Sequence, residues 1–141
     1  MIKQLFAIAA LAAMPTLAHS EVTNEAVKAR MAAMKTIGGG MKTLGDMAKG
    51  AMAFDAVAAQ GAVDSIEVAA AKVPALFEPQ ETDPKSEAKP EIWTNWDDFV
   101  AKAEALEKAA AGITISAEAD IGAAMGALGG ACKACHSDYK L

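Results

Sequence analysis

The sequence predicts an all-α fold, an up-down-up-down antiparallel four-helix bundle. Four separate segments repeat apolar residues at steps of three and four, the spacing of one face of a helix. No segment combines the apolar alternation and β-branched residues typical of strands. Glycine, proline and capping residues separate the four segments. The length of 141 residues suits one core, so we expect one domain in which four amphipathic helices share it.

Residues 1–20 are predicted to be a secretory signal peptide. Lys3 makes the start positive, residues 5–13 are apolar, and Ala18 and Ser20 are small residues where a signal peptidase reads the chain. The alternative, a retained membrane anchor, is disfavoured because the run is shorter than the ~20 residues that span a bilayer. We expect cleavage after Ser20 and export to the periplasm, with residues 21–141 as the soluble domain and no membrane span.

The first helix is expected to begin at a Thr23 cap and to end at Lys49-Gly50. The triple glycine 38–40 lies inside it, although each glycine costs roughly 1 kcal/mol against alanine. Either a flat, bulky group presses on the helix there, or the helix kinks, which we favour; the segment is also a candidate contact for a homodimer. Its apolar stripe is Arg30, Met34, Ile37, Met41, Leu44 and Ala48.

The second helix is expected to begin at an Asp55 cap and to stop before Pro79. The segment 79–89 is polar and contains two prolines, so we expect a loop there. The stripe of the second helix is Val63, Ile66, Ala70, Val73 and Phe77.

Pro90 suits the first position of the third helix, which Gly112 ends, and Ser116 with Glu118 is expected to open the fourth. Short connections make the first and second, and the third and fourth, antiparallel neighbours. Several glycines in the fourth helix (122, 126, 129 and 130) either make room for a flat, bulky group or allow close helix contact. The two stripes are Ile92, Trp96, Phe99, Ala103, Leu106 and Ala110, then Ile121, Met125, Leu128, Cys132, Cys135 and Tyr139.

Near the end of the fourth helix, Cys132–His136 has the pattern C-x-x-C-H, the signature of covalent haem attachment. Two thiols three residues apart lie on one helix face, so both can bond one edge of a porphyrin. His136 is then the proximal iron ligand. We therefore predict one covalent haem c held by Cys132 and Cys135.

Three other uses of the two cysteines are less consistent with the sequence. A disulfide oxidoreductase normally places C-x-x-C after a strand, and no strand is predicted. A zinc site needs about four ligands, but residues 21–141 contain two cysteines and one histidine. A structural disulfide leaves His136 without a role.

The second axial position of the iron has several candidates. His19 leaves with the signal peptide, so the position is methionine, a less usual ligand such as lysine, water, or empty. Antiparallel packing puts the early turns of the first helix level with His136, and Met34 lies there on the core stripe. Met41 is about 10 Å further along. Met34 is therefore the candidate distal ligand, with core packing that caps the haem without binding it as the alternative.

The sequence resembles the class II c-type cytochromes, which include the cytochromes c′ and a low-spin, six-coordinate branch. Cytochrome c′ is itself a standard example of the predicted bundle topology. The resemblance covers residues 21–141 and rests on the C-terminal motif, with shorter matches at 44–50, 54–55, 74–77 and 89–93. Residues 44–50 look more like the low-spin branch.

This resemblance implies that Met34 occupies the distal position and binds iron, and that Arg30 contacts a haem propionate. Lys140 stands where many relatives have arginine, which leaves a proximal gating role without support.

The function we expect is one-electron transfer, with redox proteins of a respiratory or photosynthetic chain as partners. The alternative is a five-coordinate, high-spin cytochrome c′ that binds nitric oxide or carbon monoxide. We expect no enzyme, since no general acid or base can be placed beside the iron. Without Lys3 the net charge of −5 becomes −6. An acidic chain argues against nucleic acid and favours a partner with a positive patch, or simply keeps the protein soluble.

Overall fold

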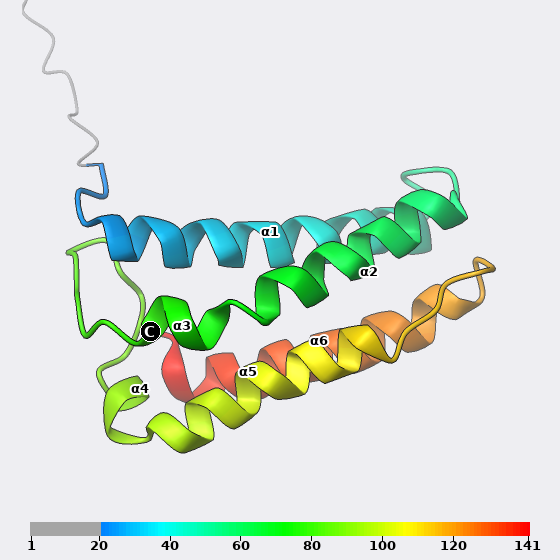
Figure 1. Ribbon diagram of the computed structural model, residues 1–141. Helices are drawn as coiled ribbons and strands as arrows, with labels where there is room; N and C mark the ends of the chain where they lie inside the picture. Colours follow the sequence, from blue (N-terminus) through cyan, green and yellow to red (C-terminus); the bar gives the residue numbers. More distant parts are fainter. Residues whose placement is uncertain (1–20) are drawn as a thin grey trace, which may run out of the picture.

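The protein forms a bundle of four long helices with two short helical segments (Figure 1). The computed structural model describes residues 21–141, and the predicted signal peptide with its cleavage site lies outside them. Helices account for all regular elements in this part of the chain apart from one isolated bridge between Ala88 and Lys140. The elements are α1 (Glu25–Ala48), α2 (Ala56–Ala70), α3 (Val73–Phe77), α4 (Glu91–Thr94), α5 (Trp96–Ala111) and α6 (Asp120–Tyr139).

The four long helices close into a ring. α1 packs on α2, α2 on α5, α5 on α6, and α6 returns to α1. Successive long helices run in opposite directions, so the ends of α1 and α6 that bear residues 25 and 139 lie at the same end of the bundle (Figure 1). The segment from α3 through the loop to α4 crosses this end too. The predicted all-α, up-down-up-down topology is confirmed.

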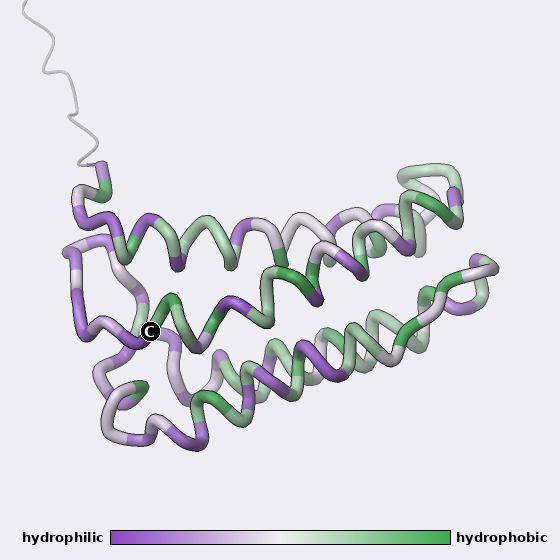
Figure 2. Tube along the Cα trace, in the orientation of Figure 1, coloured by the Kyte–Doolittle hydropathy of each residue, from purple (hydrophilic) through white to green (hydrophobic). Residues whose placement is uncertain are grey.

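The core combines the four apolar stripes. Leu44, Val63, Ile66 and Leu128, from α1, α2 and α6, have no exposed surface, and Phe99 of α5 is almost fully buried. In Figure 2 green residues recur along each long helix between purple ones, as expected of amphipathic helices. Burying such a side chain contributes roughly 1.5–3 kcal/mol, so packing dominates the stability of the bundle.

The first helix begins at a different cap from the one predicted. Asn24 has an extended backbone, and its side chain accepts a hydrogen bond from the Val27 amide at 3.0 Å. Thr23 is not the cap, because its hydroxyl donates to the carboxylate of Asp83 at 3.3 Å, as its backbone N–H does at 3.0 Å. The predicted end is confirmed: Lys49 is the C-cap, and Gly50 follows with φ +70°.

Two helices predicted as continuous are each broken once. The Asp55 cap of α2 is confirmed by its bond from the Ala58 amide at 2.9 Å. Pro74 has no N–H to donate to the carbonyl four residues earlier, so α2 ends at Ala70 and α3 starts separately. Asn95 leaves the helical region with ψ 45° and divides α4 from α5.

Of the other predicted helix ends, the C-terminus of the third helix is confirmed, and the starts of the third and fourth helices are wrong. Pro90 is the N-cap of α4 rather than its first residue, whereas Gly112 ends α5 as expected. The fourth helix begins at Asp120, not at Ser116. The Asp120 carboxylate accepts the backbone N–H groups of Ser116 at 2.9 Å and Ala117 at 2.8 Å, and the turn that this closes precedes the helix.

The glycine clusters have a different role from the one expected. α1 runs without interruption through residues 38–40. A Cβ on Gly40 would lie 2.7 Å from Cγ1 of Ile66 and 2.8 Å from the carbonyl oxygen of Ala62, so Gly40 permits the close approach of α1 to α2. In α6, where close helix contact was one of the two expectations, a Cβ on Gly129 would meet only the methyl group of Met41 at 3.9 Å.

Candidate functional site

The last two turns of α6 carry the C-x-x-C-H motif. Cys132 and Cys135 are half-buried and pack against the edge of the core. Burial is the main cause that raises the pKa of both thiols above the ordinary value. Before haem is attached, both side chains are therefore thiols at neutral pH. In haem attachment each sulfur bonds to one vinyl group of the porphyrin.

A largely apolar cavity of about 230 Å³ adjoins this motif. It lies between the start of α1, the loop at 85–88, α5 and the end of α6. This volume is below the ~300–1,000 Å³ typical of sites that enclose a drug-sized ligand. The lining residues are Val27, Arg30, Met31, Met34, Phe77, Lys85, Ser86, Glu87, Ala88, Ile92, Phe99, Cys135, His136, Tyr139 and Lys140.

The cavity brings Met34 and His136 together from opposite ends of the sequence. Met34 is half-buried against the core, whereas Met31, also in the lining, is 46% exposed. Met41 and Met125 pack along the seam between α1 and α6 and do not line the cavity. Of these four methionines, Met34 has the most suitable position for a distal iron ligand. Its bond to iron stays a prediction.

His136 is on the outward side of the cavity, within the last turn of α6. Partial burial is the main cause that lowers the pKa of its imidazole, and the positive charge of Lys140 lowers it further. Both effects favour the neutral ring, the form that binds a metal. Lys140 pairs with Glu87 at 3.0 Å. The thiols, the imidazole and the thioether thus match the donor set of a c-type haem.

Arg30 has a structural role that the sequence analysis missed. Its side chain is buried, and it donates hydrogen bonds to three backbone carbonyls: that of Leu76 in α3 at 3.0 Å, and those of Glu81 at 2.7 Å and Pro79 in the loop that follows. Its guanidinium lies 4.8 Å from the centre of the Phe77 ring. Desolvation lowers its pKa. Its place on the apolar stripe of the first helix was the feature of the sequence that could have predicted this buried role.

Arg30 also lines the cavity, with no carboxylate within ion-pair distance among the described residues. Its charge there is consistent with a propionate neighbour, but that contact remains a prediction.

Asp83 is the second residue that the sequence analysis missed. Its carboxylate accepts backbone N–H groups from Thr23 at 3.0 Å, Asn24 at 3.2 Å and Lys85 at 2.9 Å. These bonds lower the pKa of Asp83 to about 2, the Lys85 amide having the largest effect. The carboxylate thereby fastens the loop that covers the cavity to the start of α1.

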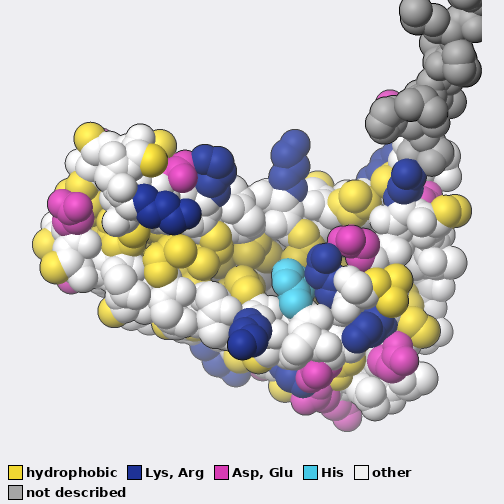
Figure 3. All heavy atoms as spheres, turned by 180° about the vertical axis from the view of Figure 1, so that it is seen from behind, with side chains coloured by type: hydrophobic (Ala, Val, Ile, Leu, Met, Phe, Trp, Pro, Cys, Tyr) yellow, Lys and Arg dark blue, Asp and Glu magenta, His cyan; other side chains and the backbone are white. Residues whose placement is uncertain are grey.

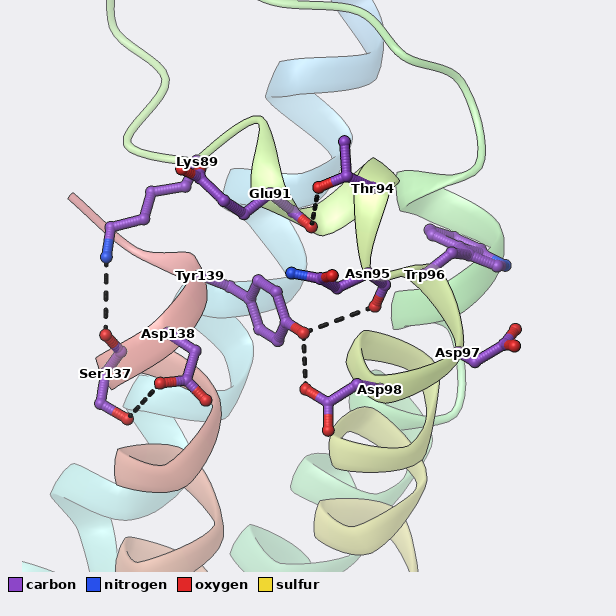
Figure 4. A pocket seen from close by; sticks show the side chains of 10 residues that line it. All are labelled: Lys89, Glu91, Thr94, Asn95, Trp96, Asp97, Asp98, Ser137, Asp138 and Tyr139. Carbon is purple, nitrogen blue, oxygen red and sulfur yellow. Dashed lines mark hydrogen bonds between the residues drawn. The ribbon is translucent and has the colours of Figure 1, made fainter.

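A second, more open hollow of about 770 Å³ lies between the loop before α4 and the facing ends of α5 and α6 (Figure 4). The Tyr139 hydroxyl donates to the Asp98 carboxylate at 2.5 Å and contacts the Asn95 carbonyl at 3.4 Å. Lys102 pairs with Asp98 at 2.5 Å and with Asp138 at 2.7 Å. These bonds hold the end of α6 against α5. The side chains that line this hollow include no thiol, imidazole or thioether.

The other uses of the two cysteines find no support within residues 21–141. No three histidine, cysteine or acidic side chains there form a metal-binding group. The two cysteines lie on a helix of a bundle rather than after a strand.

The comparisons with known proteins agree with this site. The family described as Cytochrome C' matches residues 25–140. A cytochrome c-556 of Agrobacterium tumefaciens (strain II Chrys) is 41% identical over 118 residues, covering 82% of this chain and 96% of that protein. The solved cytochrome c' of Rhodopseudomonas palustris superposes with a TM-score of 0.77 at 31% identity, covering 84% of this chain and 98% of that one.

A structural model of oxidized R. palustris cytochrome c556 is similarly close, with a TM-score of 0.76 at 28% identity over 83% of this chain and 96% of that one. The match spans the whole bundle and includes the C-terminal motif. The chain therefore belongs to the cytochrome c′ family, the class II c-type cytochromes, and carries covalently attached haem c.

Proposed function

We propose that the protein is a periplasmic one-electron carrier whose haem iron is bound by His136 and Met34. The observation that carries the proposal is the position of these two side chains in one apolar cavity, beside a cysteine of the attachment motif. Two axial side-chain ligands leave the iron no open position, and His/Met ligation raises the reduction potential. The haem supplies the one-electron couple.

The residues of the chain have distinct roles in this proposal. Cys132 and Cys135 hold the haem through thioether bonds, and the neutral ring of His136 supplies a nitrogen ligand. Met34 supplies a thioether sulfur from the facing helix. Phe77, Phe99 and the other apolar lining residues exclude water, which limits the reorganisation that accompanies a change of charge.

Two further observations support the assignment. Relatives named cytochrome c-556 reach 41% identity, whereas those named cytochrome c′ reach 36%, in line with the resemblance to the low-spin branch. The periplasmic location follows from the predicted signal peptide. No helix within residues 21–141 is long and apolar enough to cross a bilayer.

The visible absorption spectrum of the haem-loaded protein tests the proposal. We expect a sharp, low-spin α/β pair in the reduced state, unchanged by carbon monoxide, because Met34 occupies the sixth position. Met34→Ala opens that position, so its spectrum becomes high-spin and shifts with carbon monoxide. Met31→Ala is the matched control and stays low-spin.

Two results would contradict the proposal. A low-spin spectrum in Met34→Ala would exclude this residue as the ligand. A broad high-spin spectrum of the unmodified protein that shifts with carbon monoxide would favour the alternative function of binding nitric oxide or carbon monoxide.

A further inference from the structure

The exposed side of α1 carries a regular row of lysines. Lys28, Lys35, Lys42 and Lys49 are spaced seven residues apart, so they follow one another along one side of the helix at every second turn. All four are exposed. On the antiparallel neighbour α6, Lys133 and the C-cap Lys140 repeat the same spacing and are also exposed.

These two rows border the seam between α1 and α6. At about 100° per residue, the order round α1 is the core residue Ile37, the seam residue Met41 and then Lys42. Round α6 the order is the core residue Leu128, then His136 and then Lys133. Figure 3 shows this face: dark blue side chains border a yellow, apolar floor, and the cyan histidine lies among them.

The acidic side chains of the two helices cancel only part of this charge. Asp138 points to α5, where it pairs with Lys102 at 2.7 Å. Lys28 and Lys42 pair with carboxylates of their own helix, and Lys140 pairs with Glu87. None of the carboxylates in residues 21–141 forms an ion pair with Lys35, Lys49 or Lys133.

The charge of the bundle is therefore distributed unevenly. Helices α1 and α6 together contain five basic and four acidic residues, a net +1, whereas α2 and α5 contain two basic and six acidic residues, a net −4. The net charge of the chain does not show this difference between the helices, because it sums over all of them. The local electrostatic potential at the docking surface, and not the net charge of the protein alone, steers a charged partner.

We propose that the lysine-bordered α1/α6 face, with Lys35 and Lys133 at its centre, docks an acidic protein surface that exchanges electrons with the haem. The inference rests on the proposed function and reverses the partner charge expected from composition. Charge complementarity favours an acidic partner, and the apolar floor beside His136 brings it to the open side of the cavity. An anionic membrane is the less suitable occupant, because Met31 is the one large exposed hydrophobic side chain of α1 and α6.

The test measures binding and electron transfer separately on a gold electrode coated with a carboxylate-terminated monolayer. Adsorbed mass of the haem-loaded protein is followed with a quartz microbalance, and current by voltammetry, at low ionic strength. The test variant is K35E/K133E. The control K72E/K108E changes the net charge by the same −4, at exposed lysines outside the α1/α6 face. Unchanged absorption spectra show that both variants are folded.

We expect the unmodified protein and K72E/K108E to adsorb and exchange electrons, and K35E/K133E to adsorb about tenfold less. The docking inference would be overturned if both variants lost adsorption equally, or if the unmodified protein did not adsorb. A normal low-spin spectrum would still support the carrier function in either case. Adsorption that depends on this face but gives no current would support the basic surface and count against the carrier. Tighter binding to phosphatidylglycerol vesicles than to the monolayer would overturn the protein partner in favour of a membrane surface.

Discussion

Two neighbouring glycines in α1 should respond oppositely to the same substitution. Gly39 is exposed, and a Cβ built on it meets nothing within 4 Å. Gly40 is buried, and its Cβ would lie 2.7 Å from Cγ1 of Ile66 and 2.8 Å from the carbonyl oxygen of Ala62. Alanine at either position relieves the cost of glycine in a helix, about 0.5–1 kcal/mol. Only at Gly40 does it also create a clash.

The clash sets the sign of the effect at Gly40. The side chain of Ile66 can rotate, but the backbone oxygen of Ala62 cannot, so α1 and α2 must separate by about half an ångström. Overpacking of this kind costs about 1–3 kcal/mol. After the gain in helix propensity, Gly40→Ala should destabilise the protein by about 0–2.5 kcal/mol, with about 1 kcal/mol at the middle of the range, whereas Gly39→Ala should stabilise it by about 0.5–1 kcal/mol.

Chemical denaturation followed by far-ultraviolet circular dichroism measures both effects on the haem-loaded protein. The midpoints of the two variants should move in opposite directions with unchanged m-values. Gly61→Ala in α2, where a Cβ also meets nothing within 4 Å, is a further control and should resemble Gly39→Ala. If Gly40→Ala stabilised the protein as much as Gly39→Ala does, the close approach of α1 and α2 would not be real.

Two more predictions concern the loop that covers the cavity. Arg30→Met keeps an apolar stem but leaves the carbonyls of Leu76 in α3 and of Pro79 and Glu81 in the loop without their donor. It should therefore lower the free energy of unfolding by about 2–4 kcal/mol and speed proteolysis at residues 78–89. Lys28→Met, on the exposed side of α1, should do neither. Asp83 has a folded pKa of about 2, below the ordinary 3.8, so its stabilising effect is complete above pH 3.8 and is lost as the pH falls towards 2. Asp83→Asn should therefore lower the free energy of unfolding at pH 7, and this free energy should fall less steeply between pH 3.8 and 2 than in the unmodified protein. An equally steep fall in the variant would show that Asp83 does not cause it.

Much of the fold could be predicted because helical periodicity and capping are local properties. The stripe from Ile121 to Tyr139 and the Asp55 cap depend on residues close in sequence, and both predictions held. The breaks at Pro74 and Asn95 were missed because the apolar periodicity continues through them. The cap of α1 was misplaced because Thr23 bonds to Asp83, sixty residues away.

By itself, the sequence determined the chemistry of attachment: two thiols and an imidazole within five consecutive residues of one helix are enough to predict a covalent haem. Only the tertiary structure decided what surrounds that haem. The facing of Met34 and His136, the binding of the covering loop by Arg30 and Asp83, and the basic α1/α6 face all join residues that are distant in sequence. Local spacing determines which residues share a helix face, but the packing of one helix against another determines what that face meets.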